Sequence, residues 1–247
     1  MKMDPELTQM LKYLRLTGLL NHFDQFLEKA KNEDISHVRL LRYIIEQEYR
    51  IKHENARKIK LIRARIPEKW LMETFPFDRQ PKLNKKKVLI PYDTLDYMHE
   101  KRNVIFVGPT GTGKTGLATA FLIQAIDRGY NGRFILFSEL IEMLYKSVAD
   151  HSEQRLIKTF AAYDCLLIDE MGYVEVEPIQ VGLFFTLMHK RHKKKTTLIT
   201  SNLGFDQWTS FLKNEHLTAA LIDRLTENSH VINMKSCVSL RSRFSDP

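Results

Sequence analysis

Apolar residues recur along this chain with two different spacings, and the change between them divides the sequence. Residues 5–31 follow the spacing of an amphipathic helix with a break at Gly18. After a polar turn, a longer helical pattern runs from 37 to 66 and stops at Pro67. From residue 88 onward, short β-branched and apolar runs alternate with helical stretches. Short apolar strands between helices are typical of a parallel sheet covered on both faces. The pattern therefore predicts an all-α segment followed by an α/β domain.

The second part contains five predicted strands and six predicted helices. Strands are expected at 104–107, 134–137, 166–168, 197–200 and 231–234. Helices are expected near 116–128, 138–149, 152–162, 178–192, 205–212 and 217–226. Between the two parts, residues 67–87 contain three prolines and end in three lysines, which is typical of a linker. We therefore predict a helical N-terminal domain at 1–75 for oligomerisation or DNA binding, a basic linker at 76–87, and the α/β domain at 88–247.

A glycine-rich stretch, GPTGTGKT at 108–115, stands between the first predicted strand and the first helix of the α/β part. A strand, a glycine-rich turn and a helix are the context of a phosphate-binding loop, whose backbone N–H groups face the anion. Lys114 is expected to reach the β- and γ-phosphates of ATP, and the Thr115 hydroxyl is expected to hold Mg²⁺. The predicted nucleotide contacts are Gly108, Pro109, Thr110, Gly111, Thr112, Gly113, Lys114, Thr115 and Gly116.

Two later strand ends carry polar groups that suit the same site. The apolar run 165–168 leads into Asp169 and Glu170. Asp169 is expected to hold Mg²⁺ through water, and Glu170 to orient and deprotonate the attacking water. Asn202 follows the next strand and is the predicted sensor of the γ-phosphate or of that water. The alternative for Asn202 is a turn stabilised by its local hydrogen bonds.

Positive charge is concentrated at the start of the chain. The net charge is +8, and residues 1–87 carry 20 Lys and Arg against 12 Asp and Glu, while the remainder is balanced at 18 and 18. A basic appendage on a neutral domain suggests a polyanionic partner, most simply double-stranded DNA, and the alternative is a solvated basic surface. Two groups are predicted to contact DNA. The first is a helical stripe of Arg39, Arg42, Arg50, Arg57 and Lys60, and the second is a run of Lys190, Arg191, Lys193, Lys194 and Lys195. Each group has a solvated helix surface as its alternative.

Arginines near the C-terminus are candidates for trans-acting or sensing roles. Arg224 can reach the γ-phosphate of a neighbouring subunit as an arginine finger, or it can pair locally with Asp223 or Glu227. Arg241 and Arg243 are candidates for a second sensor arginine that contacts the nucleotide.

Taken together, these motifs resemble one family over nearly the whole chain. The chain is similar to the IstB-like AAA+ ATPases, the helpers of insertion-sequence transposition. The matching stretches are LRLTGLLNHF at 14–23, GPTGTGKT at 108–115, LLIDEMGY at 166–173, LITSN at 198–202 and ALIDRL at 220–225. The resemblance implies an AAA+ P-loop fold, an ATP-dependent homo-oligomer, duplex DNA and an IstA-like transposase as partners. Two positions depart from the family pattern: Gly116 stands where the family usually has His, and the segment before Arg241 is one residue longer.

Other functions remain as alternatives. A helicase loader of the DnaC type shares the ATPase core and differs in partner. A monomeric P-loop kinase of small molecules leaves the basic segment, Asn202 and Arg224 without roles, and Glu170 argues against a scaffold that scarcely hydrolyses ATP. No apolar run reaches the ~20 residues of a membrane span, and the two cysteines form no pattern, so we expect a cytoplasmic, reduced protein without a membrane partner.

Overall fold

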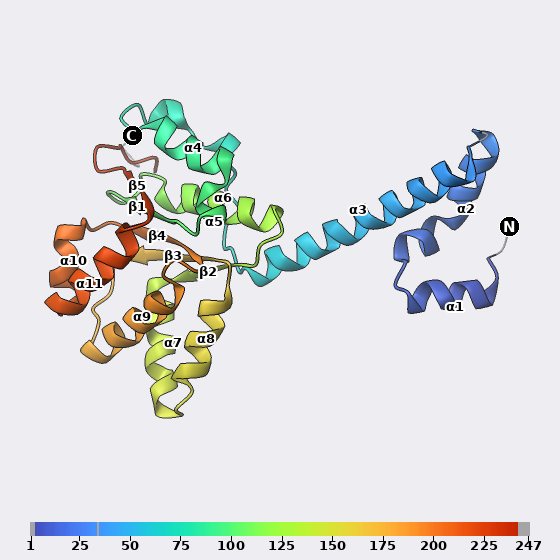
Figure 1. Ribbon diagram of the computed structural model, residues 1–247. Helices are drawn as coiled ribbons and strands as arrows, with labels where there is room; N and C mark the ends of the chain where they lie inside the picture. The colour runs from blue at the N-terminus through green and yellow to red at the C-terminus, as the bar shows by residue number, and fades with distance from the viewer. Residues whose placement is uncertain (1–2, 34, 242–247) are drawn as a thin grey trace, which may run out of the picture. The chain divides into compact units, whose positions relative to one another are not determined.

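The computed structural model describes residues 3–33 and 35–241 and contains one five-stranded parallel sheet (Figure 1). Its strands lie in the order β2-β3-β4-β1-β5, and each predicted strand is present within a few residues. Their bounds are β1 Asn103–Val107, β2 Gly132–Leu136, β3 Cys165–Met171, β4 Thr196–Ser201 and β5 Ser229–Asn233. Because β3, β4 and β1 are consecutive neighbours, the residues that follow these three strands meet at one edge of the sheet.

Helices cover both faces of the sheet, as expected from strands that are apolar on both sides. Val104 and Phe106 of β1 pack in one core cluster, and Ile105 and Val107 pack in the other. The first face carries α4 (Lys85–Thr94), α5 (Asp96–His99) and α6 (Lys114–Asp127). The second carries α7 (Phe137–Ala149), α8 (Glu153–Ala162), α9 (Pro178–Arg191), α10 (Phe205–Leu212) and α11 (Glu215–Thr226). The six helices predicted in this part are all present.

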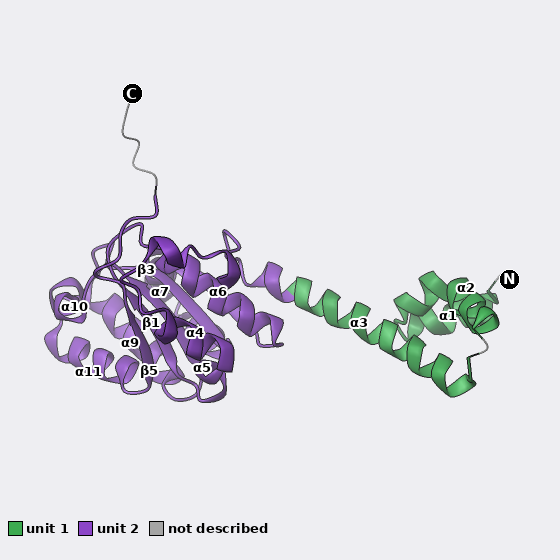
Figure 2. Cartoon of the chain, turned by 90° about the horizontal axis from the view of Figure 1, so that it is seen from above, with its two compact units in different colours: residues 1–59 green, residues 60–247 purple. Residues whose placement is uncertain are grey.

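The chain divides into two compact units at Ile59 and Lys60, earlier than the boundary expected from the sequence (Figure 2). Segment 60–84 packs on the α/β unit and contains two short helices, η1 (Met72–Thr74) and η2 (Phe77–Arg79). The Phe134 N–H of edge strand β2 donates to the Ala64 carbonyl at 2.8 Å, and Ala64 is fully buried. Lys85–Lys87 form the first turn of α4, capped by Asn84, whose side chain accepts from the Lys87 N–H at 3.1 Å. The prolines and lysines of this segment are typical of a linker, but its burial depends on contacts with the sheet.

This boundary relocates the excess charge. Unit 1, residues 1–59, carries 11 Lys and Arg against 9 Asp and Glu, a net +2. Residues 60–87 carry 9 against 3, a net +6, and they belong to the α/β unit. The α/β unit is therefore basic rather than neutral.

The helical unit contains α1 (Pro5–Tyr13), α2 (Thr17–Asn32) and most of α3 (His37–Arg63). The expected break at Gly18 is wrong: the chain turns at Leu14–Leu16, with Arg15 at a φ of +53°, and Gly18 lies inside α2. A Cβ at Gly18 would lie 2.6 Å from Oε2 of Glu48, which accepts the Leu19 N–H at 3.0 Å. Glycine therefore permits the close approach of α3 and does not end the helix. Among the helices of the described residues, none combines the length and apolar character that crossing a bilayer requires.

Candidate nucleotide-binding site

The phosphate-binding loop has the backbone that its glycines allow. It connects β1 to α6, and Gly111 and Gly113 have φ angles of +83° and +94°, in the region that favours glycine. The Lys114 ammonium donates to the carbonyls of Gly108 and Pro109 at 2.7 and 2.8 Å. These contacts hold the lysine across its own loop, in reach of an anion bound there.

Lys114 is buried, with 8% of its surface exposed. Burial lowers the pKa of its ammonium, the charge of Arg241 lowers it further, and the carboxylates of Asp169 and Glu170 act in the opposite direction. A buried cation without a firm ion pair is electrostatically unfavourable, so this site favours an anionic ligand.

A threonine from each neighbouring segment binds the carboxylate of Asp169. Thr115 Oγ1 donates to both of its oxygens, at 3.0 and 3.1 Å, and Thr200 Oγ1 donates to Oδ1 at 2.5 Å. Burial raises the pKa of Asp169, and the two hydroxyl donors oppose that shift. The Thr115 hydroxyl and this carboxylate are hard oxygen donors side by side, a set that fits Mg²⁺.

An irregularity in β3 brings two consecutive acids to the same cavity. Side chains alternate between faces in a regular strand, so Asp169 and Glu170 would otherwise point apart. The pairing of β3 with β4 is shifted between Ile168 and Met171, and Glu170 has a φ of +61°. The Glu170 N–H donates to Thr200 Oγ1 at 3.0 Å. Asp169 is buried and Glu170 is exposed, yet both line the cavity.

Asn202 supplies a polar group without a partner. Its Oδ1 atom is buried and makes no hydrogen bond with any described residue. A Cβ at Gly172, which has a φ of +112°, would lie 2.6 Å from this atom. Glycine thus leaves room for the amide, whose unpaired oxygen can accept a hydrogen bond from a water.

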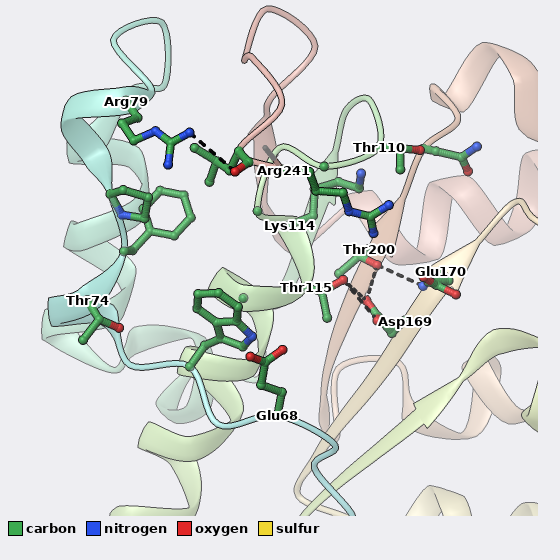
Figure 3. Close-up of a pocket in the computed structure, with 18 of the residues that line it drawn as sticks. Glu68, Thr74, Arg79, Thr110, Lys114, Thr115, Asp169, Glu170, Thr200 and Arg241 are labelled. Atoms are coloured by element: carbon green, nitrogen blue, oxygen red, sulfur yellow. Dashed lines mark hydrogen bonds between the residues drawn. The ribbon is translucent and has the colours of Figure 1, made fainter. Parts of the chain in front are cut away.

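These groups surround a cavity of about 530 Å³ (Figure 3). Most of the nucleotide contacts expected from the sequence line it together, and Arg224 does not. The expected residues in its lining are Thr110, Gly111, Gly113, Lys114, Thr115, Gly116, Asp169, Glu170, Asn202 and Arg241. Of the remaining loop residues, Gly108 and Pro109 accept from Lys114, and the Thr112 carbonyl accepts from Gln80 at 3.1 Å.

Residues that the sequence analysis assigned to a linker form the other wall. The cavity wall opposite the two acids is lined by Glu68, Trp70, Thr74, Phe75, Pro76 and Arg79. The signal in the sequence was the presence of Trp70 and Phe75, because flexible linkers are poor in large aromatic residues. Tyr173 was also missed, and its hydroxyl lies 2.7 Å from Thr110 Oγ1.

Gln80 connects the loop to the segment that precedes Arg241. This side chain is 2% exposed, donates to the carbonyls of Thr112 and Val238 at 3.1 and 2.7 Å, and accepts the Val238 N–H at 3.0 Å. The Leu240 N–H donates to the Gly111 carbonyl at 2.8 Å. The chain therefore crosses the phosphate loop immediately before Arg241, which lines the cavity. Arg243 lies outside the described residues.

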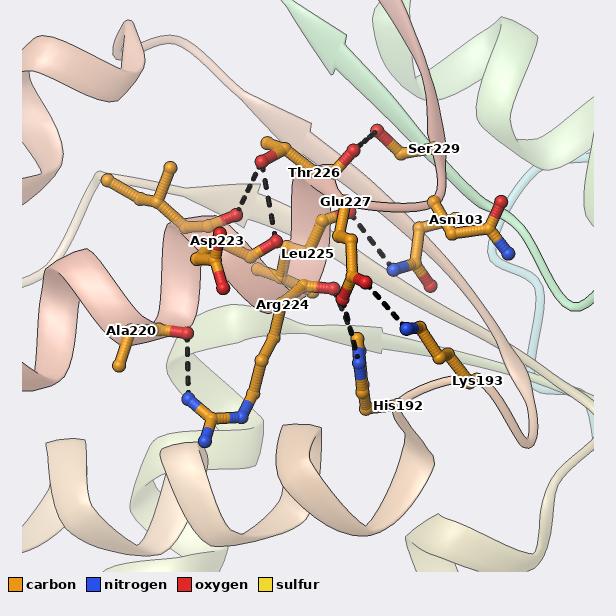
Figure 4. A network of polar contacts seen from close by, with 12 residues as sticks. Asn103, His192, Lys193, Ala220, Asp223, Arg224, Leu225, Thr226, Glu227 and Ser229 are labelled. Atoms are coloured by element: carbon orange, nitrogen blue, oxygen red, sulfur yellow. Dashed lines mark hydrogen bonds and ion pairs between the residues drawn. The ribbon is translucent and has the colours of Figure 1, made fainter.

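Arg224 makes contacts within its own subunit (Figure 4). Its Nη1 donates to the Ala220 carbonyl at 2.9 Å, and its guanidinium lies 4.7 Å from the centre of the Phe185 ring. Its expected local partners are engaged differently: Glu227 pairs with Lys193 at 2.5 Å and with His192 at 3.2 Å. The side chain is partly exposed, so it is accessible to a second molecule.

The model of the family described as "IstB-like ATP binding protein" matches residues 9–245. The chain belongs to this family. The resemblance drawn from the motifs is thus confirmed.

Two relatives agree with this IstB-like membership, and two solved structures have a similar fold. The IS21 putative ATP-binding protein of Pseudomonas aeruginosa is 31% identical over 230 residues, 93% of this chain and 86% of that protein. The IS5376 putative ATP-binding protein of Geobacillus stearothermophilus is 30% identical over 224 residues, 90% and 88% of the two chains. DnaI is similar in structure with a TM-score of 0.56 at 16% identity, over 68% of this chain and 92% of that one. AMPPCP-bound DnaA from Aquifex aeolicus gives 0.55 at 17%, over 69% and 51%. At these identities the likeness concerns the fold alone, which is the expected AAA+ class.

In this IstB-like chain, the basic residues expected at DNA have different surroundings. Arg39, Arg42, Arg50 and Arg57 of α3 are exposed, whereas Lys60 is partly buried and donates to the Gly129 carbonyl. In the second group, Lys190 and Lys194 are exposed, Lys193 pairs with Glu227, and Lys195 pairs with Asp164 at 2.6 Å.

The prediction that Arg191 contacts DNA is wrong. Its side chain is 1% exposed and donates to the carbonyls of Phe160 and Tyr163 at 2.9 and 2.8 Å, to that of Thr196, and to Thr197 Oγ1 at 3.0 Å. Burial lowers its pKa to about 10. Arg191 therefore joins α8, α9 and β4 inside the unit and is not available to DNA.

Proposed function

We propose that this chain is an ATPase that assembles with ATP and Mg²⁺ on duplex DNA and assists an IstA-like transposase in insertion-sequence transposition. The observation that carries the proposal is the set of contacts around Asp169. The Thr115 and Thr200 hydroxyls hold its carboxylate, while Lys114 and Glu170 line the same cavity. Family membership supports ATP as the nucleotide and an insertion sequence as the context.

Each side chain has one task in this proposal. Lys114 binds the β- and γ-phosphates, and Thr115 and Asp169 hold Mg²⁺, which neutralises charge on the phosphates. Glu170 takes a proton from the attacking water, because it is the exposed carboxylate of the pair. Asn202 positions that water by accepting from it through its unpaired Oδ1, or senses the γ-phosphate by donating from its amide N–H. Arg241 contacts the phosphates from the end of the segment that crosses the phosphate loop.

Lys114→Ala and Glu170→Gln separate binding from hydrolysis. We expect Lys114→Ala to lose ATP binding, because the fixed cation at the phosphates is removed. Glu170→Gln should bind ATP but hydrolyse it at least about 100-fold more slowly, the usual contribution of a general base. Calorimetric titration and phosphate release measure the two effects. Equal ATP affinity in wild type and Lys114→Ala would disprove the site assignment.

DNA binding is proposed for the exposed arginines of α3. Arg39, Arg42 and Arg50 lie on one side of the helix, where they can follow a phosphate backbone. If all three contact phosphates, their replacement by Ala should lower duplex affinity for every sequence and reduce the salt slope by about 2.7, at ~0.9 per contact. ATP should strengthen binding, since assembly multiplies these contacts.

The matched control for this triple variant carries the same loss of charge on the same unit. It replaces the exposed Lys31, Lys52 and Lys58 by Ala, none of which belongs to the stripe. Fluorescence anisotropy between 50 and 200 mM salt measures both variants. Equal affinities and salt slopes for the two would mean that the stripe is only a solvated surface.

The partner distinguishes the proposal from its closest alternative, a helicase loader of the DnaC type. The ATPase chemistry of the two functions is the same, so it cannot separate them. Immobilised chain with bound ATP should retain the transposase encoded beside it and not the replicative helicase of the same organism. Retention of the helicase alone would favour the loader.

A further inference from the structure

The cavity extends beyond the groups that suit phosphates and Mg²⁺. One side is formed by the phosphate loop, the acids and Asn202, and the opposite wall comes from residues 68–79. Three neighbours in that wall, Trp70, Phe75 and Pro76, have apolar rings. Such rings have no part in binding a triphosphate, so this half of the cavity suits a different portion of the ligand.

Trp70 lies directly against the first turn of α6. A Cβ added to Gly116 would be 3.3 to 3.6 Å from Cδ2, Cγ and Cε3 of the indole, so the ring contacts the helix just after Thr115. Glycine at 116 leaves the space that the indole occupies. Trp70 nevertheless remains 37% exposed. An aromatic ring that is partly open, at the wall of a cavity and next to a phosphate loop, is suited to stacking on a planar base.

The polar groups beside Trp70 favour a base edge that carries hydrogen-bond donors. The Thr74 hydroxyl and N–H both donate to the Leu71 carbonyl, at 3.0 and 3.2 Å, and the Phe75 N–H donates to Met72. Pro76 has no N–H, and the Arg79 guanidinium is directed to the Leu240 carbonyl at 3.5 Å (Figure 3). The carboxylate of Glu68, which can only accept, lines the same wall. Apart from the indole N–H itself, the cavity-lining side chains of residues 68–76 thus offer acceptors.

We infer that Trp70 is the platform on which the purine base of the nucleotide stacks, and that Glu68 selects adenine by accepting from its 6-amino group. Guanine carries a carbonyl oxygen at that position, which a carboxylate repels. The inference rests on the proposed function, because the triphosphate must occupy the phosphate loop. It assigns a role to two residues of a segment that the sequence pattern marks as a linker, and it accounts for Gly116.

The experiment compares three probes on the full chain: non-hydrolysable analogues of ATP and GTP, and tripolyphosphate, which has no base. Trp70→Leu should weaken the ATP analogue by about 5- to 150-fold, the usual effect of removing an aromatic base platform. Its affinity for tripolyphosphate should be unchanged, and Trp70→Phe should retain most of the affinity for the analogue. Glu68→Gln should lower the preference for the ATP analogue over the GTP analogue by at least about 5-fold.

Tryptophan fluorescence gives a second readout, because the other tryptophan, Trp208, is fully buried. The ATP analogue should quench the exposed indole and protect it from iodide, whereas saturating tripolyphosphate should do neither. Gly116→Val should weaken the analogue, since its side chain would displace the ring.

The outcomes distinguish this inference from the proposed function. If Trp70→Leu binds the ATP analogue like wild type, or loses tripolyphosphate to the same extent, Trp70 is not a base platform. An unchanged preference in Glu68→Gln overturns the selectivity for adenine alone. If wild type binds none of the three probes, the proposed nucleotide site itself is wrong.

Discussion

Replacement of Arg191 by Met tests whether this residue holds the fold or contacts DNA. Methionine retains the apolar stem and removes the donors to the carbonyls of Phe160, Tyr163 and Thr196 and to Thr197 Oγ1. Four acceptors lose a charged donor, at about 1–2 kcal/mol each or ~4–8 in total. Burial lowers the pKa of Arg191 to about 10, and this cost of burying the charge offsets about 3 kcal/mol of the loss. The net loss of stability is therefore about 1–5 kcal/mol.

The assay is thermal unfolding followed by circular dichroism, with Lys190→Ala as the control. For an α/β unit of this size, about 1–5 kcal/mol corresponds to a fall in Tm of about 2–20 °C. Lys190 neighbours Arg191 and is exposed, so its replacement should change stability by less than about 0.5 kcal/mol. At a temperature where both variants are folded, Arg191→Met should keep the duplex affinity and salt slope of wild type. A variant with wild-type Tm and a reduced salt slope would refute the structural role.

Three further predictions concern other parts of the chain. Arg224→Ala should bind ATP normally and hydrolyse it at least about 10-fold more slowly. If the arginine acts in trans, mixing this variant with Glu170→Gln should restore activity. Absence of rescue in co-assembled subunits would assign Arg224 a local role in packing on Phe185. Gln80→Ala should lower the Tm by about 3–10 °C through its three lost hydrogen bonds. Gln80→Glu should lower it at least as far, because its buried carboxylate would face the Thr112 and Val238 carbonyls where the amide donates. Equal Tm values for Gln80→Ala and wild type would contradict this. Cys165 should not react with a thiol reagent at pH 8 before unfolding, because burial raises its pKa to about 12 and keeps the thiol protonated. Fast labelling of Cys165 in the native protein would contradict this.

The sequence by itself determined the sheet and the chemical half of the site. Each strand of the sheet is a short apolar run, and the phosphate loop is a set of consecutive residues, so local patterns were enough to locate them. Asp169 and Glu170 were found because they follow a buried strand directly. Family membership was equally accessible, because its motifs are continuous stretches of the chain.

The tertiary structure alone decided which residues complete the site and where the units divide. Gln80 meets Val238, and Thr200 meets Asp169, across long separations in the sequence, so no local pattern contains these contacts. Segment 67–87 resembles a linker because its prolines and lysines are local signals, whereas its burial depends on the surface of the sheet. Arg191 resembles its lysine neighbours in composition, yet its guanidinium satisfies several buried carbonyls at once. A side chain's exposure and partners are properties of the packed molecule, and in this chain they separate a residue inside the fold from one on its surface.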